Sequence, residues 1–422
     1  MSGTGWPQSE GEDAFLLHLP EWTYPGKWPS RTGVAVSGGS DSMALLHLFW
    51  RLQMHHVGTV YAVTVDHRLR PEAAEEARFV ARFCAELGVP HDTLVWDHGP
   101  IQGNLQDQAR RARYALIGDW ARGAGITDVV LGHTADDQAE TFLMGLAREA
   151  GLDGLSGMRR SWTEAGLRWA RPYLSASRED MRSYLVRHGL TWVDDRSNTD
   201  DRFQRVKARR ALDALAPLGI TAEGLAGVVT NLAIARSDLV HLALETASRI
   251  TRTEAGEVVF DLRPWKTTGT DTRRRLLIAA VRWVSSADYA PRAEQIARLE
   301  ASIWQGRDAT LAGCKVTVTV AELRVSREPK TVAGLECPTD VLWDRRWRLT
   351  GPHDPALRIR ALGPDGLRAC KDWRESGLSR AALIVSPAIW RGEELIAAPL
   401  TGKTNGWMAE IVTPFPEGVL SH

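Results

Sequence analysis

The sequence predicts an α/β fold with a parallel sheet in its N-terminal half, a helical middle region and a small mixed C-terminal domain. From Arg31 onward, short apolar runs alternate with amphipathic helical segments, which is the pattern of strands joined by crossover helices. The chain has 422 residues, more than one ordinary domain contains, so further regions are expected beyond the sheet.

The chain is expected to divide into four parts, because its composition changes along its length. The parts are a leader over 1–30 with a short helix at Asp13–His18, the parallel-sheet domain over 31–215, a mainly helical region over 216–335, and a small C-terminal domain over 336–422. The segment Glu336–Pro338 is expected to be the linker to the last part.

The elements follow from the spacing of apolar residues and from the positions of Gly and Pro. Strands are expected at Thr32–Val36, Thr59–Val65, Thr93–Trp96 and Thr127–Leu131, with a strand or hairpin at Trp162–Arg171 and paired strands at Lys315–Ser326. Helices are expected from Met43 onward and at Glu72–Leu87, Leu105–Ala121, His133–Ala147, Arg178–His188, Leu225–Arg249 and Thr272–Ser285.

Composition excludes several classes of protein. The 52 basic and 52 acidic residues cancel, so any nucleic-acid binding must come from local patches. The four cysteines are widely separated and form no C-x-x-C, which argues against a disulfide scaffold, a zinc ribbon or an iron–sulfur site. No signal peptide and no apolar run of membrane-spanning length are seen, so no membrane contact and a cytoplasmic location are expected. A homodimer is compatible with the sequence.

The segment Ser37-Gly38-Gly39-Ser40-Asp41-Ser42 lies between an apolar strand and an apolar helix. Adjacent glycines let backbone N–H groups approach an anion, and the helix N-terminus adds positive potential. The ionised Asp41 side chain cannot donate a hydrogen bond, so beside a phosphate it is better suited to hold Mg²⁺. The Walker lysine is absent. A turn with a helix cap is the alternative interpretation.

Two further segments are candidates for nucleotide contact. Asp66 and His67 follow the strand Thr59–Val65 and should lie at the ligand edge of the sheet, although a polar strand exit explains them too. Arg110 and Arg113 share one helix face, and a guanidinium binds two phosphate oxygens at once. A solvated basic face is the alternative.

The helix His133–Ala147 is expected to carry a cation site. A helical wheel places Ala139, Phe142, Leu143 and Leu146 on the buried face and His133, Asp137, Glu140 and Thr141 on the opposite one. Neighbouring carboxylates at Asp137 and Glu140 suit an ammonium ion or a metal. An acidic first turn that favours the helix dipole is the alternative, and it explains Glu140 less well.

Seven segments in this order resemble the tRNA(Ile)-lysidine synthetase family, a branch of the PP-loop ATP pyrophosphatases. They cover about residues 31–210 and are SGGSDS at Ser37, VDHRLR at Val65, NLQDQARRARY at Asn104, HTADDQAETFL at His133, GLDGLSGM at Gly151, RPYL at Arg171 and DDRSN at Asp194. Three stretches depart from the family pattern, namely Arg148–Gly151, Asp195–Asn198 and the basic element Arg205–Arg209.

The resemblance implies an ATP-dependent ligase that joins free L-lysine to carbon 2 of the wobble cytidine in isoleucine tRNA with a CAU anticodon. Adenylated tRNA would be the intermediate, and lysidine, AMP and pyrophosphate the products. It implies ATP-phosphate binding by Ser37–Ser42 with Asp41 near Mg²⁺, and an α-phosphate or adenylate contact by Arg113.

The resemblance further implies a lysine pocket formed by His133, Asp137 and Glu140. The basic element Arg205, Lys207 and Arg209 would contact the tRNA backbone, and the C-terminal domain is a second candidate for tRNA contact. Two other functions stay open at this point. One is a PP-loop tRNA thiolase, which needs a reactive cysteine pair or a sulfur carrier. The other is a tRNA-binding protein without activity.

Overall fold

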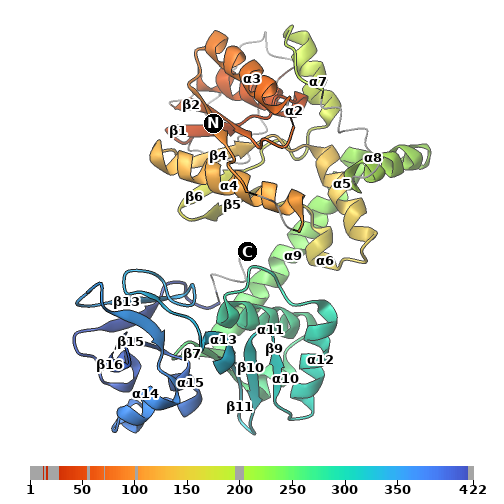
Figure 1. The fold of residues 1–422 in the computed structure, drawn as a ribbon. Helices are drawn as coiled ribbons and strands as arrows, with labels where there is room; N and C mark the ends of the chain where they lie inside the picture. The colour runs from red at the N-terminus through yellow and green to blue at the C-terminus, as the bar shows by residue number, and fades with distance from the viewer. Residues whose placement is uncertain are drawn as a thin grey trace, which may run out of the picture. The chain divides into compact units, whose positions relative to one another are not determined.

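The computed structural model describes Asp13, Leu16, Leu17 and residues 28–54, 58–70, 72–99, 103–194 and 204–416. The chain forms two compact units, Met1–Arg236 and Ser237–His422, and each is described by itself (Figure 1). Half of the expected helix Asp13–His18, and the whole motif from Asp195 to Asn198, lie outside the described residues. The boundaries expected near residues 30, 215 and 335 stay predictions.

The first unit contains a six-stranded sheet in the order β3-β2-β1-β4-β6-β5. All neighbouring strands are parallel except β5 and β6, which form an antiparallel hairpin, so the predicted α/β fold with a parallel sheet is confirmed. The strands are β1 (Arg31–Ala35), β2 (Thr59–Asp66), β3 (His91–Val95), β4 (Asp128–Leu131), β5 (Ser161–Glu164) and β6 (Leu167–Ala170).

The helices of this unit start and end at recognisable signals. The Asn104 side chain accepts from two backbone N–H groups at the start of α4, and Gly88 ends α3 in the left-handed conformation. The helices are α2 (Ser40–Gln53), α3 (Ala73–Leu87), α4 (Leu105–Gly123), α5 (Ala135–Leu146), α6 (Leu152–Leu155), α7 (Arg178–Arg187), α8 (Gln204–Leu215), η4 (Ala216–Leu218) and α9 (Ala222–Ile250), the last continuing into the second unit.

The sheet is buried on both faces, as a parallel sheet with crossover helices must be. Val34 of β1 and Ala62 of β2 point to the face that packs against α2, α3 and α7. Val63 of β2 and Val129 of β4 point to the opposite face, which packs against α4. Cys84 lies in the first of these cores, where burial raises its pKa to about 12, so this thiol is structural.

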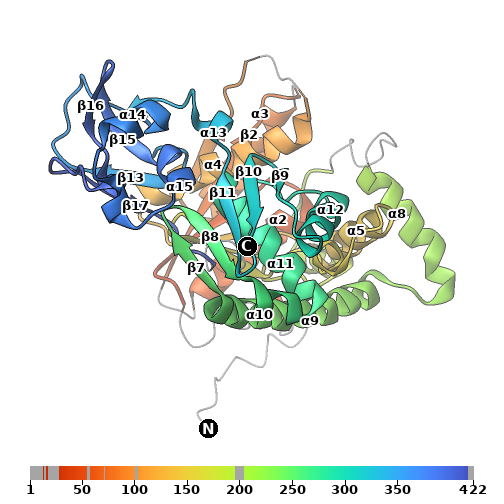
Figure 2. The same cartoon turned by 90° about the horizontal axis from the view of Figure 1, so that it is seen from below.

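The second unit begins with an antiparallel sheet in the order β7-β8-β11-β10-β9, and Figure 2 shows α11 and α12 beside it. Leu276 of α11 and Ile303 of α12 share its core with Val316 and Val325. The elements are β7 (Thr251–Glu254), β8 (Glu257–Asp261), α10 (Leu262–Thr267), α11 (Thr270–Ser285), α12 (Ala293–Trp304), β9 (Ala309–Leu311), β10 (Cys314–Val318), β11 (Glu322–Arg327) and α13 (Pro329–Val332).

The rest of this unit contains a four-stranded sheet, β12-β14-β15-β16, and the pair β13–β17. The prediction of a linker at Glu336–Pro338 is wrong, because β12 (Cys337–Pro338) pairs with β14 in that sheet. The other elements are β13 (Trp347–Thr350), β14 (Arg358–Ala361), α14 (Gly363–Ala369), η5 (Trp373–Ser376), α15 (Arg380–Ile384), β15 (Pro387–Arg391), β16 (Glu394–Ala397), η6 (Pro399–Thr401) and β17 (Met408–Ile411).

Within the described residues, no single helix combines the length and apolar composition of a membrane span. One bent pair, Gln204–Leu218 with Ala222–Ile250, meets those criteria only when the two are taken together, across an angle of 101°.

Candidate active site

The loop Ser37–Ser42 leaves the end of β1 and turns directly into α2. Gly38 has φ +91°, a conformation that only glycine adopts without strain. Ser42 closes the turn, because its Oγ donates to the Gly39 carbonyl at 3.0 Å and accepts from the Ser37 N–H at 3.1 Å. The loop is therefore held in shape by its own side chains, and the N-terminus of α2 opens beside it.

Gly132, directly after β4, allows the sheet to approach this loop closely. A Cβ at this position would lie 3.0 Å from the Asp41 carbonyl oxygen and 3.0 Å from the Ser42 Cα. Both are backbone atoms, which cannot rotate out of the way as a side chain does. A side chain here would therefore force the loop to shift by a few tenths of an ångström. This constraint was not identified from the sequence.

Strand β1 lies between β2 and β4 at the centre of the sheet. After β1 the chain continues to β2 on one side, and it later returns to β4 on the other side of β1. The direction in which strands are added to the sheet therefore changes at β1. Ligands of such sheets bind at this switch point, beyond the carboxyl ends of the strands. The loop after β1, Asp66 at the end of β2 and His133 after β4 all lie at that edge, as the sequence predicted.

Four carboxylates surround one guanidinium at this edge. Arg178, the first residue of α7, lies between carboxylates from α2 and α5. Its side-chain nitrogens are 3.3 Å from Asp41, 3.7 Å from Asp136, 3.6 Å from Asp137 and 3.4 Å from Glu140. Burial alone would lower the pKa of Arg178, but these four anions raise it.

The helical-wheel prediction for α5 is wrong in part. Asp137 and Glu140 are buried, whereas Leu146, expected in the core, is 48% exposed. Asp137 also caps the helix, because its carboxylate accepts from the Thr134 N–H at 3.0 Å. The wheel contrasted a buried face with an opposite polar face, but the polar face is covered as well, because α7 and α8 supply Arg178 and Arg209 to it.

Glu140 is fully buried and receives a second guanidinium. Arg209 of α8 donates from Nε to Glu140 Oε1 at 2.6 Å. Arg209 was predicted to contact tRNA, but the structure places it within this carboxylate cluster. Arg205 and Lys207 on the same helix are exposed.

A second set of side chains at the same edge is cationic. Arg171, which is only 4% exposed, donates from Nε to His133 Nδ1 at 3.2 Å and from an Nη to the Tyr114 hydroxyl at 3.1 Å. The guanidinium groups of Arg110 and Arg113 lie 5.1 and 5.6 Å from the centre of the Tyr114 ring. These groups can bind phosphate oxygens.

The histidines of this edge are held neutral. Burial, and then the charges of Arg171, Arg113, Arg205 and Arg110, lower the pKa of His133 well below its ordinary value. Burial and Arg113 likewise lower the pKa of His67. His133 accepts at Nδ1 from Arg171, so its proton is on Nε2, where it can be donated. His133 thus lies among cations, whereas the sequence placed it with the lysine-binding carboxylates.

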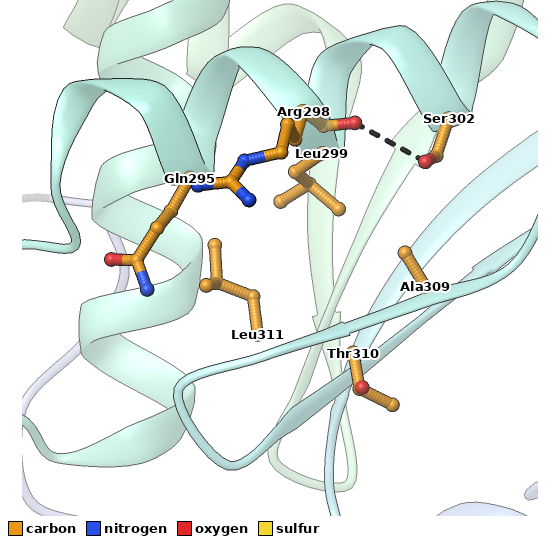
Figure 3. Close-up of a pocket in the computed structure, with 7 residues that line it drawn as sticks. All are labelled: Gln295, Arg298, Leu299, Ser302, Ala309, Thr310 and Leu311. Atoms are coloured by element: carbon orange, nitrogen blue, oxygen red, sulfur yellow. Dashed lines mark hydrogen bonds between the residues drawn. The ribbon is translucent and has the colours of Figure 1, made fainter.

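Figure 3 shows a shallow pocket in the second unit, between α12 and β9. Arg298 is its one charged side chain, and the dashed contact joins Ser302 Oγ to the Arg298 carbonyl at 3.2 Å. The loop and the carboxylates belong to the first unit, so we assign no chemistry to this pocket. Among the described residues, no group of three or more His, Cys, Asp and Glu side chains is arranged to hold a metal ion.

Comparison with known proteins agrees with this geometry. Residues 18–215 match the PP-loop domain family. The tRNA(Ile)-lysidine synthase of Ruegeria pomeroyi is 45% identical over 93% of this chain and 95% of its own length. The chain belongs to the tRNA(Ile)-lysidine synthase family.

A second relative, the tRNA(Ile)-lysidine synthase of Wolbachia from Brugia malayi, is 32% identical over 79% of this chain and 80% of its own length. Among solved structures, the U34-tRNA thiolase NcsA from Methanococcus maripaludis has a TM-score of 0.46 and 13% identity, over 53% of this chain and 78% of that one.

Sequence reasoning about this lysidine synthase relative missed three residues of the site: Arg178, Arg171 and Gly132. Arg171 belongs to the RPYL segment and Arg178 to a basic stretch. The sequence showed that both side chains are positively charged, but it did not show which groups they contact. Their partners are 38 to 137 residues away in the sequence, and no local pattern reveals contacts of that range.

Proposed function

We propose that this protein ligates lysine to carbon 2 of the wobble cytidine in isoleucine tRNA with a CAU anticodon, using ATP. The observation that supports it best is the meeting of three groups at one sheet edge: the Ser37–Ser42 loop, the arginine cluster around His133, and the carboxylates around Arg178. They suit phosphates, a leaving adenylate and a cationic amino acid.

In the first step, the cytosine carbon-2 oxygen attacks the α-phosphorus of ATP, a phosphorus–oxygen bond forms, and pyrophosphate leaves. We assign the leaving pyrophosphate to the backbone N–H groups of Ser37–Ser42. Arg113 is assigned to the α-phosphate, where its charge opposes the negative charge that develops. Asp66 and His67, at the end of β2, are assigned to the nucleotide.

Asp41 fits a Mg²⁺ ion that is held mainly by ATP, because such ions use one or two carboxylates together with substrate phosphates. When bound, the ion would neutralise phosphate charge. Burial, partly opposed by Arg178, raises the pKa of Asp41, so a cation beside this carboxyl favours its ionised form.

In the second step, the lysine amine attacks carbon 2, a carbon–nitrogen bond forms and AMP leaves with the bonding electrons. We assign the lysine to Asp137 and Glu140. The ε-ammonium must lose a proton before it attacks, and we assign one of these two carboxylates as the acceptor. Carboxylates favour the charged form of the amine, so their main action is to position it. Neutral His133, with its proton on Nε2, is assigned as a donor to the leaving phosphate oxygen, at the boundary of the lysine pocket.

The exposed side chains Arg205 and Lys207 of α8 are proposed to bind tRNA phosphates. Arg209 is proposed to hold Glu140 instead, because its Nε lies 2.6 Å from that carboxylate. The C-terminal domain as a second tRNA contact, the homodimer and the cytoplasmic location stay predictions.

Incubation of the protein with ATP, labelled lysine and isoleucine tRNA bearing CAU tests the proposal. Label is expected in the tRNA, with equal amounts of AMP and pyrophosphate, and an elongator methionine tRNA serves as the control substrate. Absence of label in the isoleucine tRNA would refute the activity. Asp41→Asn should lower turnover by roughly 100-fold or more with an unchanged circular dichroism spectrum.

A further inference from the structure

The proposed reaction leaves one central side chain without a role. Arg178 is 18% exposed and lies at the middle of the carboxylates that we assign to lysine and Mg²⁺. Its backbone is firmly held, because its N–H donates to Asp136 Oδ2 at 2.6 Å. Its guanidinium, in contrast, makes longer contacts, of 3.3 to 3.7 Å.

Every contact that the Arg178 side chain makes with the described part of the chain is long. The four nitrogen–oxygen distances run from 3.3 to 3.7 Å, and none forms a paired, two-point contact. Structural ion pairs elsewhere in this chain are shorter: Arg209 lies 2.6 Å from Glu140, and Arg327 binds Asp344 through two nitrogens at 3.0 and 2.8 Å. A guanidinium shared loosely among four anions is easier to displace than one in a two-point pair.

Among the residues that the structure describes, the cluster also has more negative than positive charge. Asp41, Asp136, Asp137 and Glu140 face two guanidinium groups, those of Arg178 and Arg209. Glu140 is 0% exposed, and its Oε2 has no hydrogen-bond partner within the described residues. A buried anionic oxygen without a donor is costly, so the cluster is incomplete as it stands and favours a further cationic donor.

We propose that Arg178 is a resident counter-cation of the lysine pocket, and that the incoming lysine ammonium replaces its guanidinium at Asp137 and Glu140. This inference rests on the proposed function. Arg178 acts through the carboxylates, so it is a positioning residue. It keeps them close together before lysine arrives, and it lowers the apparent affinity for lysine because the two cations compete.

The arrangement also favours lysine over neutral amino acids. An uncharged side chain cannot replace a guanidinium without leaving buried carboxylates unpaired, whereas an ammonium can. Norleucine, which has a methyl group where lysine has its ammonium, is therefore expected to leave Arg178 in place.

Calorimetric titration of L-lysine into the full chain in the presence of a non-hydrolysable ATP analogue tests the inference. R178Q removes the competing charge and is expected to lower the Kd for lysine on the order of tenfold. R182Q, the same change one turn later on α7, is the matched control and should bind like the wild type. Norleucine should not bind the wild type. A Kd for R178Q that is equal to or higher than that of the wild type overturns the inference.

A second variant covers the case in which R178Q is poorly folded. R178K keeps a positive charge among the carboxylates, so its Kd is expected to stay within about threefold of the wild type. A rise of about tenfold or more would show that the guanidinium itself helps to bind lysine, which also overturns the inference.

The outcomes separate this inference from the function on which it rests. If the wild type binds lysine and R178Q binds it more weakly, the resident-cation role fails and the ligase stands. If the wild type neither binds lysine nor incorporates it into tRNA, the proposed function fails, and the inference fails with it.

Discussion

At the scale of single residues, the site depends on side chains whose charge state is set by their neighbours. Arg171 is the clearest example. It contacts His133 at 3.2 Å, the Tyr114 hydroxyl at 3.1 Å and the Arg159 carbonyl at 2.8 Å, so one buried guanidinium orients two ring systems. It also helps to keep His133 neutral, because a nearby positive charge disfavours a second one.

Arg171→Gln should move the acid limb of the activity profile to higher pH. Burial is the main cause of the lowered pKa of His133, and the charge of Arg171 is the next. Without this charge the pKa rises, so the imidazole becomes protonated at a higher pH than in the wild type. Incorporation of labelled lysine into the tRNA, measured from pH 5 to 8, checks this, because His133 is assigned to the step in which AMP leaves. Arg168→Gln, a change three residues earlier, is the control and should keep the wild-type profile. An unshifted acid limb in Arg171→Gln would contradict the role given to Arg171.

At the scale of elements, the end of β4 and the start of α2 meet at Gly132, where a side chain would force the loop to shift. This contact connects the phosphate loop to the strand that positions His133, and so joins the two halves of the site. On the far side of α2, Asp13 connects that helix to α7 through Arg51 at 2.6 Å and Arg187 at 2.8 Å.

Gly132→Ala should weaken both ATP binding and folding. The new methyl group would lie 3.0 Å from backbone atoms of Asp41 and Ser42, so the loop must shift. We expect a rise in the KM for ATP of roughly tenfold and a loss of about 1–3 kcal/mol of unfolding free energy. Gly123→Ala, where no atom lies within 4 Å, is the matched control. An unchanged KM in Gly132→Ala would show that the close approach does not shape the loop.

Asp13→Asn should destabilise the first unit in a pH-dependent way. Burial opposes ionisation, but hydrogen bonds from Arg187, His188 and Arg51 lower the pKa of Asp13 from 3.8 to about 2. The folded-state pKa lies below the unfolded one, so this stabilisation is present above pH 3.8 and is lost as the pH falls through 2. We expect a loss of about 2 kcal/mol at pH 7 and a smaller loss near pH 3. Denaturant unfolding at both pH values provides the measurement, and equal losses at the two would contradict it.

At the scale of the whole molecule, stability is coupled to pH through buried neutral histidines. Burial lowers the pKa of His47, in the α2–α7 core, to about 4. The pKa values of His67, His91 and His133 are lowered as well, mainly by burial. Below pH 6.5 the unfolded chain binds protons that the folded chain does not bind, so acid favours unfolding in this window.

The melting temperature should therefore fall as the pH is lowered from about 6.5 to 5, where most carboxylates are still ionised. Calorimetry across this range gives the slope. His47→Gln should have a shallower slope, because one of the groups that couples protonation to unfolding is removed. A melting temperature that stays flat from pH 6.5 to 5 would show that these histidines do not remain neutral in the folded state.

Local pattern was sufficient for most of the first unit. The alternation of strands and helices predicted the parallel sheet, and the expected ranges of Thr59–Val65 and Leu105–Ala121 agree closely with β2 and α4. Where a prediction was wrong, the structure depended on contacts with residues far away in the sequence. The segment Glu336–Pro338 was predicted to be a linker. Its strand was not recognised, because β14, the strand that pairs with it, begins twenty residues after Pro338. Leu146 was placed in the core by a wheel that could not show which neighbours surround α5.

By itself, the sequence determined the fold class, and it pointed to the loop Ser37–Ser42 and the pair Asp137 and Glu140 as candidates, because each depends on residues close together in the chain. The tertiary structure alone decided what those groups face. It brought Arg178 to the carboxylates, Arg209 to Glu140 and Arg171 to His133. The charge balance of a site is a sum over neighbours in space, and folding selects those neighbours from distant parts of the chain.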